Sequence, residues 1–422
     1  ITATILAYCK TMGALENFCD FLRIRSVSHE GPQGAYIEAI IFLRSTYEKR
    51  LRCSSVTQFE VSDGRPVLIF SIEGKSPNLK SVVLNCHTDV VPAVDEKWSY
   101  PPFDAHIDEK GDIYGRGTQD MKSVGIQYLE ALCGLRDRGV DFERTIHILF
   151  VPDEEIGGIQ GMGLLVRTKE WRELNAGVVL DEGLASPTET YTVFYGERAP
   201  IWLRLRARGP TGHASRFIAN SANERLFRVI NKIYEFRKEQ EKEVGMLAEC
   251  GCSHVVAKKL GDVTTVNCTM LKSGVSTDDG KTYCLNVIPS EAEAGFDMRV
   301  ATTIPLDEFK IMLESWAAEE NVEVDISYMP EKHAITPMSD SWWKVFEHAC
   351  EKAGINIEPE VFPAATDSRY IRVLDIPAFG FSPMNNTPIL LHDHNERIHK
   401  DVFLSGIDIY RTIIPSLANH VK

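Results

Sequence analysis

The amino-acid sequence predicts an α/β protein that carries a smaller, inserted α+β domain. Helical and strand patterns alternate towards both ends of the chain, which favours a sheet covered by helices. The middle instead has the order strand, helix, strand, strand, helix, strand (βαββαβ), which is typical of a ferredoxin-like antiparallel sheet with two helices on one face. At 422 residues the chain also exceeds the length at which one core usually keeps growing. We therefore expect one domain from residues 1–194 and 331–422, interrupted by a second domain at 195–330.

In the first domain, apolar residues recur at helical spacing in five segments. These segments are residues 15–23, 36–50, 121–138, 161–167 and 402–417. Short apolar runs predict five strands, at residues 67–72, 81–86, 145–151, 177–180 and 378–381. The run at 81–86 is almost continuously apolar, as expected of a strand that is covered on both faces.

The inserted domain has its own set of patterns. Strands are expected at residues 201–208, 264–271, 291–300 and 322–328. Two amphipathic helices are expected at residues 222–241 and 306–317. The chain then returns to the first domain.

Composition excludes several classes of protein. The formal net charge of −14 argues against a nucleic-acid partner, because phosphate binding requires clustered Lys and Arg. The sequence contains no apolar run of about 18 residues, so no membrane-spanning helix is expected. Ten scattered cysteines include no C-x-x-C pair, which is typical of free thiols in the cytoplasm.

Acids and histidines follow the predicted strands at the point where each strand ends. His87-Thr88-Asp89, Asp153-Glu154-Glu155 and Asp181-Glu182 follow three strands, Asp120 lies in a Gly-rich turn, and His392 lies far downstream. In an open α/β sheet, ligands gather beyond the carboxyl ends of the strands. Two imidazoles and three or more carboxylates could hold a pair of divalent metal ions, with zinc the leading candidate. One remaining acid could move protons, which points to metal-assisted hydrolysis.

Residue chemistry suggests roles within this set. Asp89 lies two residues after His87 and could orient its ring as the acceptor for its second N–H. If strand geometry continues, Glu154 and Glu155 point in opposite directions, so one could bind metal while the other serves as general base. Asp120 is the candidate for a ligand shared by two metal ions.

Five motifs occur in a characteristic order. They are LNCHTDVVP, YGRGTQDMKS, FVPDEEIGG, VLDEG and LLHDHNER. In this order they resemble the motifs of the dizinc exopeptidase and deacylase family, and from about Leu15 onward the chain resembles its aminoacylase branch. The resemblance implies two Zn²⁺ per subunit, one held by His87, Asp120 and Glu182 and the other by Asp120, Glu155 and His392. It also implies Glu154 as general base and then general acid, Asp89 as support for His87, a cis peptide bond at Asp120-Met121, and His392 rather than His394 as ligand.

The same resemblance assigns roles to the inserted domain and to substrate contacts. The inserted domain would be a lid that forms a homodimer and sends His213 of GPTGHAS into the partner's active site, where it stabilises the oxyanion. Asn286 of LNVIP would contact substrate, and Arg369 of ATDSRY would pair with the substrate α-carboxylate. The lid segment at residues 272–285 is longer than is usual in this branch, and the segment at residues 245–260 has no family counterpart that we can assign.

The implied reaction is hydrolysis of N-acyl-L-amino acids, such as N-acetylated ones, to a carboxylate and a free L-amino acid. Two zinc ions would activate the attacking water, and Glu154 would accept its proton. The alternatives are a dipeptidase or desuccinylase of the same fold, or a catalytically silent metal-binding homologue. We expect a small-molecule substrate and a cytoplasmic homodimer with neither nucleic-acid nor membrane partners.

Overall fold

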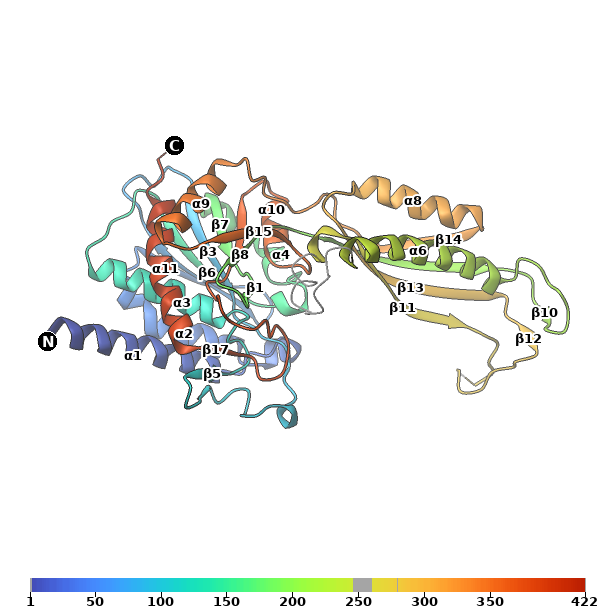
Figure 1. Cartoon of the computed structure of the whole chain (residues 1–422), viewed down its shortest axis with the longest axis horizontal. Coiled ribbons are helices and arrows are strands. Elements are labelled where there is room, and N and C mark those ends of the chain that lie inside the picture. The colour runs from blue at the N-terminus through green and yellow to red at the C-terminus, as the bar shows by residue number, and fades with distance from the viewer. Residues whose placement is uncertain (1, 246–259, 279, 422) are drawn as a thin grey trace. The chain divides into compact units, whose positions relative to one another are not determined.

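The computed structural model describes residues 2–245, 260–278 and 280–421. The chain divides into two compact units (Figure 1). The first unit comprises Ile1–Tyr195, Ile335–Glu360 and Thr366–Lys422, and the second comprises Gly196–Ala334 and Val361–Ala365. The chain therefore passes between the units four times, whereas the sequence patterns indicated only two crossings. Within the described ranges, no helix has both the length and the apolar character needed to cross a membrane.

The first unit is built on an eight-stranded mixed sheet. Its strand order is β1-β2-β6-β3-β7-β16-β8-β15. The strands are β1 (Ser55–Ser62), β2 (Arg65–Ile72), β3 (Ser81–His87), β6 (Ile146–Val151), β7 (Ala176–Asp181), β8 (Tyr191–Glu197), β15 (Ile357–Phe362) and β16 (Ala378–Phe381). Strands β6, β3, β7 and β16 are parallel neighbours, while β1, β2 and β8 pair antiparallel to theirs. A separate small sheet joins β17 (Arg397–His399), β5 (Asp112–Tyr114) and β4 (His106–Ile107).

Helices cover this sheet on both faces. The helices are α1 (Thr2–Arg23), α2 (Tyr36–Leu51), α3 (Lys122–Asp137), α4 (Met162–Leu165), α5 (Lys169–Glu173), α9 (Ser341–Lys352), α10 (Ser368–Arg372) and α11 (Lys400–Ala418). Along β3, Val82 and Leu84 enter one apolar core and Val83 enters the other. This alternation follows from the two-residue period of a strand. The expectation that β3 is covered on both faces is confirmed, and so is the α/β fold class.

The second unit has the strand and helix order that its sequence pattern indicates. Its main sheet is antiparallel throughout, in the order β11-β13-β9-β14. The strands are β9 (Ala199–Arg208), β11 (Thr265–Ser273), β13 (Glu291–Val300) and β14 (Val322–Tyr328), and the helices are α6 (Ala222–Gly245) and α8 (Leu306–Glu319). A separate pair joins β10 (Gly212–His213) to β12 (Val287–Ile288). Most of the segment without a family counterpart, residues 246–259, lies outside the described residues.

Several elements were not expected from the sequence. They include β1, β8, β15, α9, α10 and the small sheet of β17, β5 and β4. Strand β1 is mostly exposed and has no continuous apolar run, so its sequence gives little strand signal. Helix α1 also begins earlier than predicted, at Thr2.

Candidate metal centre and active site

Three parallel neighbours of the sheet bring acids and histidines to one edge. His87 is the last residue of β3, Asp181 is the last residue of β7, and β6 ends two residues before Asp153. Because β6, β3 and β7 run parallel, their carboxyl ends meet at the same side of the sheet. The prediction that these strands deliver their polar residues to one edge is confirmed.

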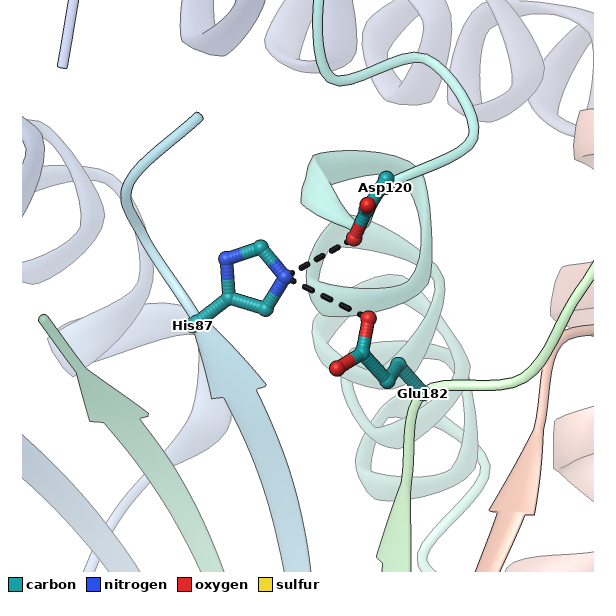
Figure 2. A group of neighbouring side chains, drawn as sticks. All are labelled: His87, Asp120 and Glu182. Atoms are coloured by element: carbon teal, nitrogen blue, oxygen red, sulfur yellow. Dashed lines mark hydrogen bonds and ion pairs between the residues drawn. The ribbon is translucent and has the colours of Figure 1, made fainter. Parts of the chain in front are cut away.

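The first ligand group consists of His87, Asp120 and Glu182. The Nε2 atom of His87 lies 2.9 Å from Oδ1 of Asp120 and 3.5 Å from Oε2 of Glu182 (Figure 2). Figure 2 shows His87 and Glu182 leaving the ends of their strands, while Asp120 stands just before a helix, which is α3. All three residues are buried, and their ligand atoms lie within 4.8 Å of one another.

The second group contains Asp120, Glu155 and His392. Here Nε2 of His392 lies 2.9 Å from Oε2 of Glu155 and 3.2 Å from Oδ2 of Asp120. Asp120 thus turns one oxygen towards each group, as a bridging ligand would. His394 belongs to neither group within the described part of the chain. The peptide bond between Asp120 and Met121 is cis, as the family resemblance implied.

Electrostatics at this edge are dominated by closely packed carboxylates. Burial raises the pKa of Glu182 well above its ordinary value, and the charges of Glu154 and Asp120 act in the same direction. Burial and the charge of Asp120 also raise the pKa of Glu155, to about 7. Hydrogen bonds to Asp120 and Glu155 raise the pKa of His392 to about 10. These shifts reflect how closely the carboxylates are packed around one another and around the His392 ring.

The donor set fits divalent metal ions. Imidazole nitrogens and carboxylate oxygens are the ligands that zinc prefers at catalytic sites. The Oε1 atom of Glu155 is buried and has no hydrogen-bond partner within the described residues. A buried, unpartnered carboxylate oxygen is costly, and a cation beside it removes that cost. The site is therefore that of a metal cofactor.

The segment after β6 does not continue as a strand, so the expected opposite orientation of Glu154 and Glu155 has no basis. Asp153 adopts a left-handed backbone conformation (φ 67°), and Glu154–Ile156 form a short 3-10 helix. The Asp89 carboxylate accepts the N–H of Glu154 at 3.2 Å and that of Glu155 at 3.1 Å. Asp89 thus fixes the backbone of both glutamates.

Asp89 and His87 interact mainly through the backbone of Asp89. Nδ1 of His87 lies 2.9 Å from the Asp89 carbonyl oxygen but 3.7 Å from its carboxylate. Burial opposes a charge on His87, but the carboxylates of Asp120, Asp89 and Glu182 outweigh this effect and hold its pKa well above the ordinary value. The carbonyl contact places a hydrogen on Nδ1 and leaves Nε2 to face the ligand group.

Glu154 lies beside the two groups but belongs to neither. It is buried, and this burial raises its pKa well above the ordinary value, helped by the charges of Asp367, Glu155 and Asp120. A carboxyl group with a raised pKa suits a residue that must accept a proton and later return it.

Asp367 is a residue that sequence reasoning missed. It is 1% exposed, and its carboxylate has no hydrogen-bond partner among the described residues. Its charge raises the pKa of Glu154 more than that of Glu155 does. The sequence did contain a signal, because an acid directly follows the small residues Ala364, Ala365 and Thr366. The motif that contains it was interpreted only for Arg369.

The remaining predicted residues lie in different parts of the chain. Arg369 lies on α10 in the first unit, donates to the Gly157 carbonyl oxygen, and stands 4.8 Å from the ring centre of Tyr370. His213 and Asn286 lie in the second unit, at the β10–β12 pair, where Ala214 N donates to Asn286 O at 2.9 Å. Nδ1 of His213 lies 2.8 Å from the Ser215 hydroxyl. Both ligand groups draw their residues from the first unit alone.

Fold and site together define a metal-dependent hydrolase that acts on amide bonds. Residues 83–416 match the pattern of peptidase family M20/M25/M40, and the chain belongs to this family. The chain is 49% identical to aminoacylase-1 of Dictyostelium discoideum, covering 95% of this chain and 97% of that protein. It is 46% identical to aminoacylase-1 of Homo sapiens, covering 95% and 94%. The family expected from the motifs is confirmed.

A solved structure supports the fold. The chain superimposes on an M20 family metallo-carboxypeptidase of Sulfolobus solfataricus with a TM-score of 0.70 and 19% sequence identity, covering 96% of this chain and 99% of the other. At this identity the likeness concerns the fold alone.

Proposed function

We propose that this protein hydrolyses N-acyl-L-amino acids, such as N-acetylated ones, to a carboxylate and a free L-amino acid, with a pair of zinc ions as cofactor. The observation that carries the proposal is near-full-length identity of 45–49% to proteins named aminoacylase-1. The two ligand groups that share Asp120 support a pair of ions rather than one. Imidazole and carboxylate donors in a catalytic site favour zinc.

In this proposal His87, Asp120 and Glu182 hold one zinc ion, and Asp120, Glu155 and His392 hold the other. When bound, such ions lower the pKa of water and polarise a carbonyl oxygen. The two oxygens of Asp120 face the two groups, Oδ1 towards His87 and Oδ2 towards His392, so Asp120 would serve both ions. The backbone carbonyl of Asp89 orients the His87 ring.

Glu154 moves the proton. Its carboxylate takes a proton from the attacking water, whose oxygen forms the new bond to the acyl carbon. It then gives this proton to the leaving nitrogen as the C–N bond breaks, so that a carboxylate and a free amine result. The buried setting of Glu154 supports this role because burial raises its pKa and so favours the protonated form that must later deliver the proton.

Substrate contacts come from three further residues. The Arg369 guanidinium pairs with the substrate α-carboxylate, a role that its planar fork of donors suits. His213 from the second unit of a partner subunit donates to the oxyanion that forms on the attacked carbonyl, and Asn286 contacts the substrate beside it. The protein is in this view a homodimer that uses its second unit for assembly. A cytoplasmic location belongs to the same proposal and is supported by the cysteine pattern.

The proposal is tested with purified protein reconstituted with zinc. We expect kcat/KM for N-acetyl-L-methionine to exceed that for dipeptides and for N-succinylated amines. Preference for a dipeptide or a succinylated amine would instead select one of the alternatives from the same fold.

A Glu154→Gln variant separates catalysis from metal binding. We expect it to retain both zinc ions and to lose turnover by about 10²–10⁴-fold, the usual contribution of a general base. Glu130→Gln is the matched control, because Glu130 is also a buried glutamate but lies in a separate hydrogen-bond network with Arg50. Unchanged turnover in Glu154→Gln would remove Glu154 as the base.

Site sharing is tested by mixing two inactive subunits. In a dimer of His213→Ala with Glu154→Gln, one of the two composite sites contains both native residues. Random mixing should therefore restore about a quarter of wild-type turnover. Absence of any recovery would contradict the shared site.

A further inference from the structure

Glu396 is a buried glutamate that lies outside both ligand groups, yet it holds the turn that carries Asp120. Its carboxylate is fully buried and accepts backbone N–H bonds from Gly117 at 3.1 Å, Gln119 at 2.7 Å and Asp120 at 3.3 Å. It also forms an ion pair with Nη1 of Arg116 at 2.8 Å. The Glu396 side chain thus holds the turn at residues 116–120, which lies about 280 positions earlier in the sequence.

The side chain of Gln119 connects the turn to the segment that contains His392. From the turn it donates to the carbonyl oxygens of Pro388 at 2.9 Å and Arg397 at 2.8 Å, and it accepts the N–H of Leu390 at 3.0 Å. Its side chain is buried. The segment around His392 is therefore tied to the turn by three hydrogen bonds of the Gln119 side chain.

Arg116 links the turn to the backbone of His392, and its own side chain is buried. Its Nη2 atom lies 3.5 Å from the backbone oxygen of His392 and 3.4 Å from that of Pro92. Its guanidinium carbon lies 5.2 Å from the ring centre of Trp98, and its side chain is 3% exposed. Buried charge-assisted hydrogen bonds of this kind are stronger than exposed ones.

We propose that Arg116, Gln119 and Glu396 form a clasp that sets the position of His392 relative to Asp120, and thereby the affinity of the Asp120–Glu155–His392 group for its metal ion. The three are positioning residues: Glu396 and Arg116 contact the backbone of Asp120 and His392, respectively, and Gln119 contacts the segment around His392. The inference rests on the proposed ligand set.

The two ligand groups differ in what else holds them. His87 ends a core strand and Glu182 directly follows another, so the sheet itself positions them. Residues 382–396 contain neither helix nor strand. Within this segment His392 adopts a left-handed backbone conformation (φ 59°), which a non-glycine residue seldom adopts without outside support. The clasp supports His392, which belongs to the second group only, while the Asp120 turn that it also holds serves both groups.

The decisive variant is Glu396→Gln. Glutamine presents one acceptor oxygen and an amide that faces N–H donors, so part of the network is lost while side-chain volume is kept. Residues that orient metal ligands typically change metal affinity by about 10–100-fold when they are replaced. We expect a loss of this size for the zinc ion held by His392 and a smaller loss for the other, because both groups share Asp120 but only one of them depends on His392. Gln119→Met, which keeps length but removes all three hydrogen bonds, should weaken the same ion.

The measurement is zinc titration of the metal-free full-length protein against a competing chelator, with the visible spectrum of the cobalt-substituted protein as a second readout. Glu130→Gln is the control, since it removes charge from a buried glutamate whose two oxygens bind Arg50 at 2.8 Å each. Selective weakening of one ion in Glu396→Gln, but not in Glu130→Gln, supports the clasp. Wild-type affinities at both sites, or equal losses in the two variants, would overturn it.

If Glu396→Gln does not fold, Gln119→Met and Arg116→Lys decide the question on the same criteria. The readout is metal affinity and not turnover. A failure of the clasp is therefore distinct from a failure of the proposed function, which the wild-type assay with N-acetyl-L-methionine tests alone.

Discussion

Replacement of Asp89 by Asn separates two roles that one residue can play. The Asp89 carboxylate accepts the backbone N–H groups of Glu154 and Glu155, at 3.2 and 3.1 Å. The replacement leaves the Asp89 carbonyl oxygen in place, and this oxygen accepts a hydrogen bond from Nδ1 of His87 at 2.9 Å. The sequence suggested that the carboxylate orients His87, whereas the geometry indicates that it positions Glu154, the proposed general base, together with Glu155.

The magnitude follows from the hydrogen bonds. Asparagine has one acceptor oxygen, so one of the two N–H groups faces an amide donor and loses its partner. A buried hydrogen bond to a charged group contributes about 1.5–3 kcal/mol, and Asp89→Asn should lower the free energy of unfolding by that amount. A shift of about 1 Å in Glu154 would lower kcat by about 10²-fold.

The assay is turnover of N-acetyl-L-methionine at increasing zinc concentration, together with urea unfolding. If Asp89 acts on Glu154, the loss of kcat persists in excess zinc, because the base and not the metal is misplaced. Glu130→Gln controls for the general effect of altering a buried acid. Recovery of Asp89→Asn to wild-type kcat in excess zinc would refute this reasoning and assign the carboxylate to positioning a metal ligand, either His87 or Glu155.

Three further predictions concern protonation and packing. Burial lowers the pKa of His147 from 6.5 to about 4, so the unfolded chain takes up a proton first on acidification. The free energy of unfolding should therefore fall by about 3 kcal/mol between pH 6.5 and 4, and urea titrations of His147→Gln should lack this fall. Because the pKa is about 10 for His392 and about 7 for Glu155 without metal, zinc binding should release protons and tighten as pH rises; calorimetry in buffers of different ionisation enthalpy measures this release. Gly125→Ala would place a methyl group 2.6 Å from Cys86 Sγ and should cost about 1–3 kcal/mol in urea unfolding, with partial relief by Cys86→Ala.

The sequence predicts the core of the site because local patterns determine it. His87 and Glu182 come directly after apolar runs, and a parallel sheet places the ends of such runs together. The conformation of Glu154–Ile156 could not be predicted in the same way. It depends on the left-handed backbone of Asp153 and on N–H bonds to Asp89, which lies about 65 positions earlier.

The sequence did not predict elements whose residues show no regular apolar pattern or change in composition. The edge strand β1 is largely exposed, so burial imposes little pattern on its sequence. The segment Val361–Ala365 belongs to the second unit although residues on either side of it belong to the first. Such a crossing is a property of tertiary contacts, and no composition change marks it.

The acids at this edge of the sheet divide into two kinds according to the donors around them. Asp89 and Glu396 face backbone N–H groups and hold irregular segments in place. Asp120, Glu155 and Glu182 face histidine rings and further carboxylates, an arrangement that is stable only when cations or protons neutralise it. The sequence alone cannot separate the two kinds, because both are acids that follow apolar runs or lie in short turns. The surrounding donors separate them: a carboxylate supplied with N–H groups positions the backbone, and one that faces a histidine ring among other acids suits a metal ion.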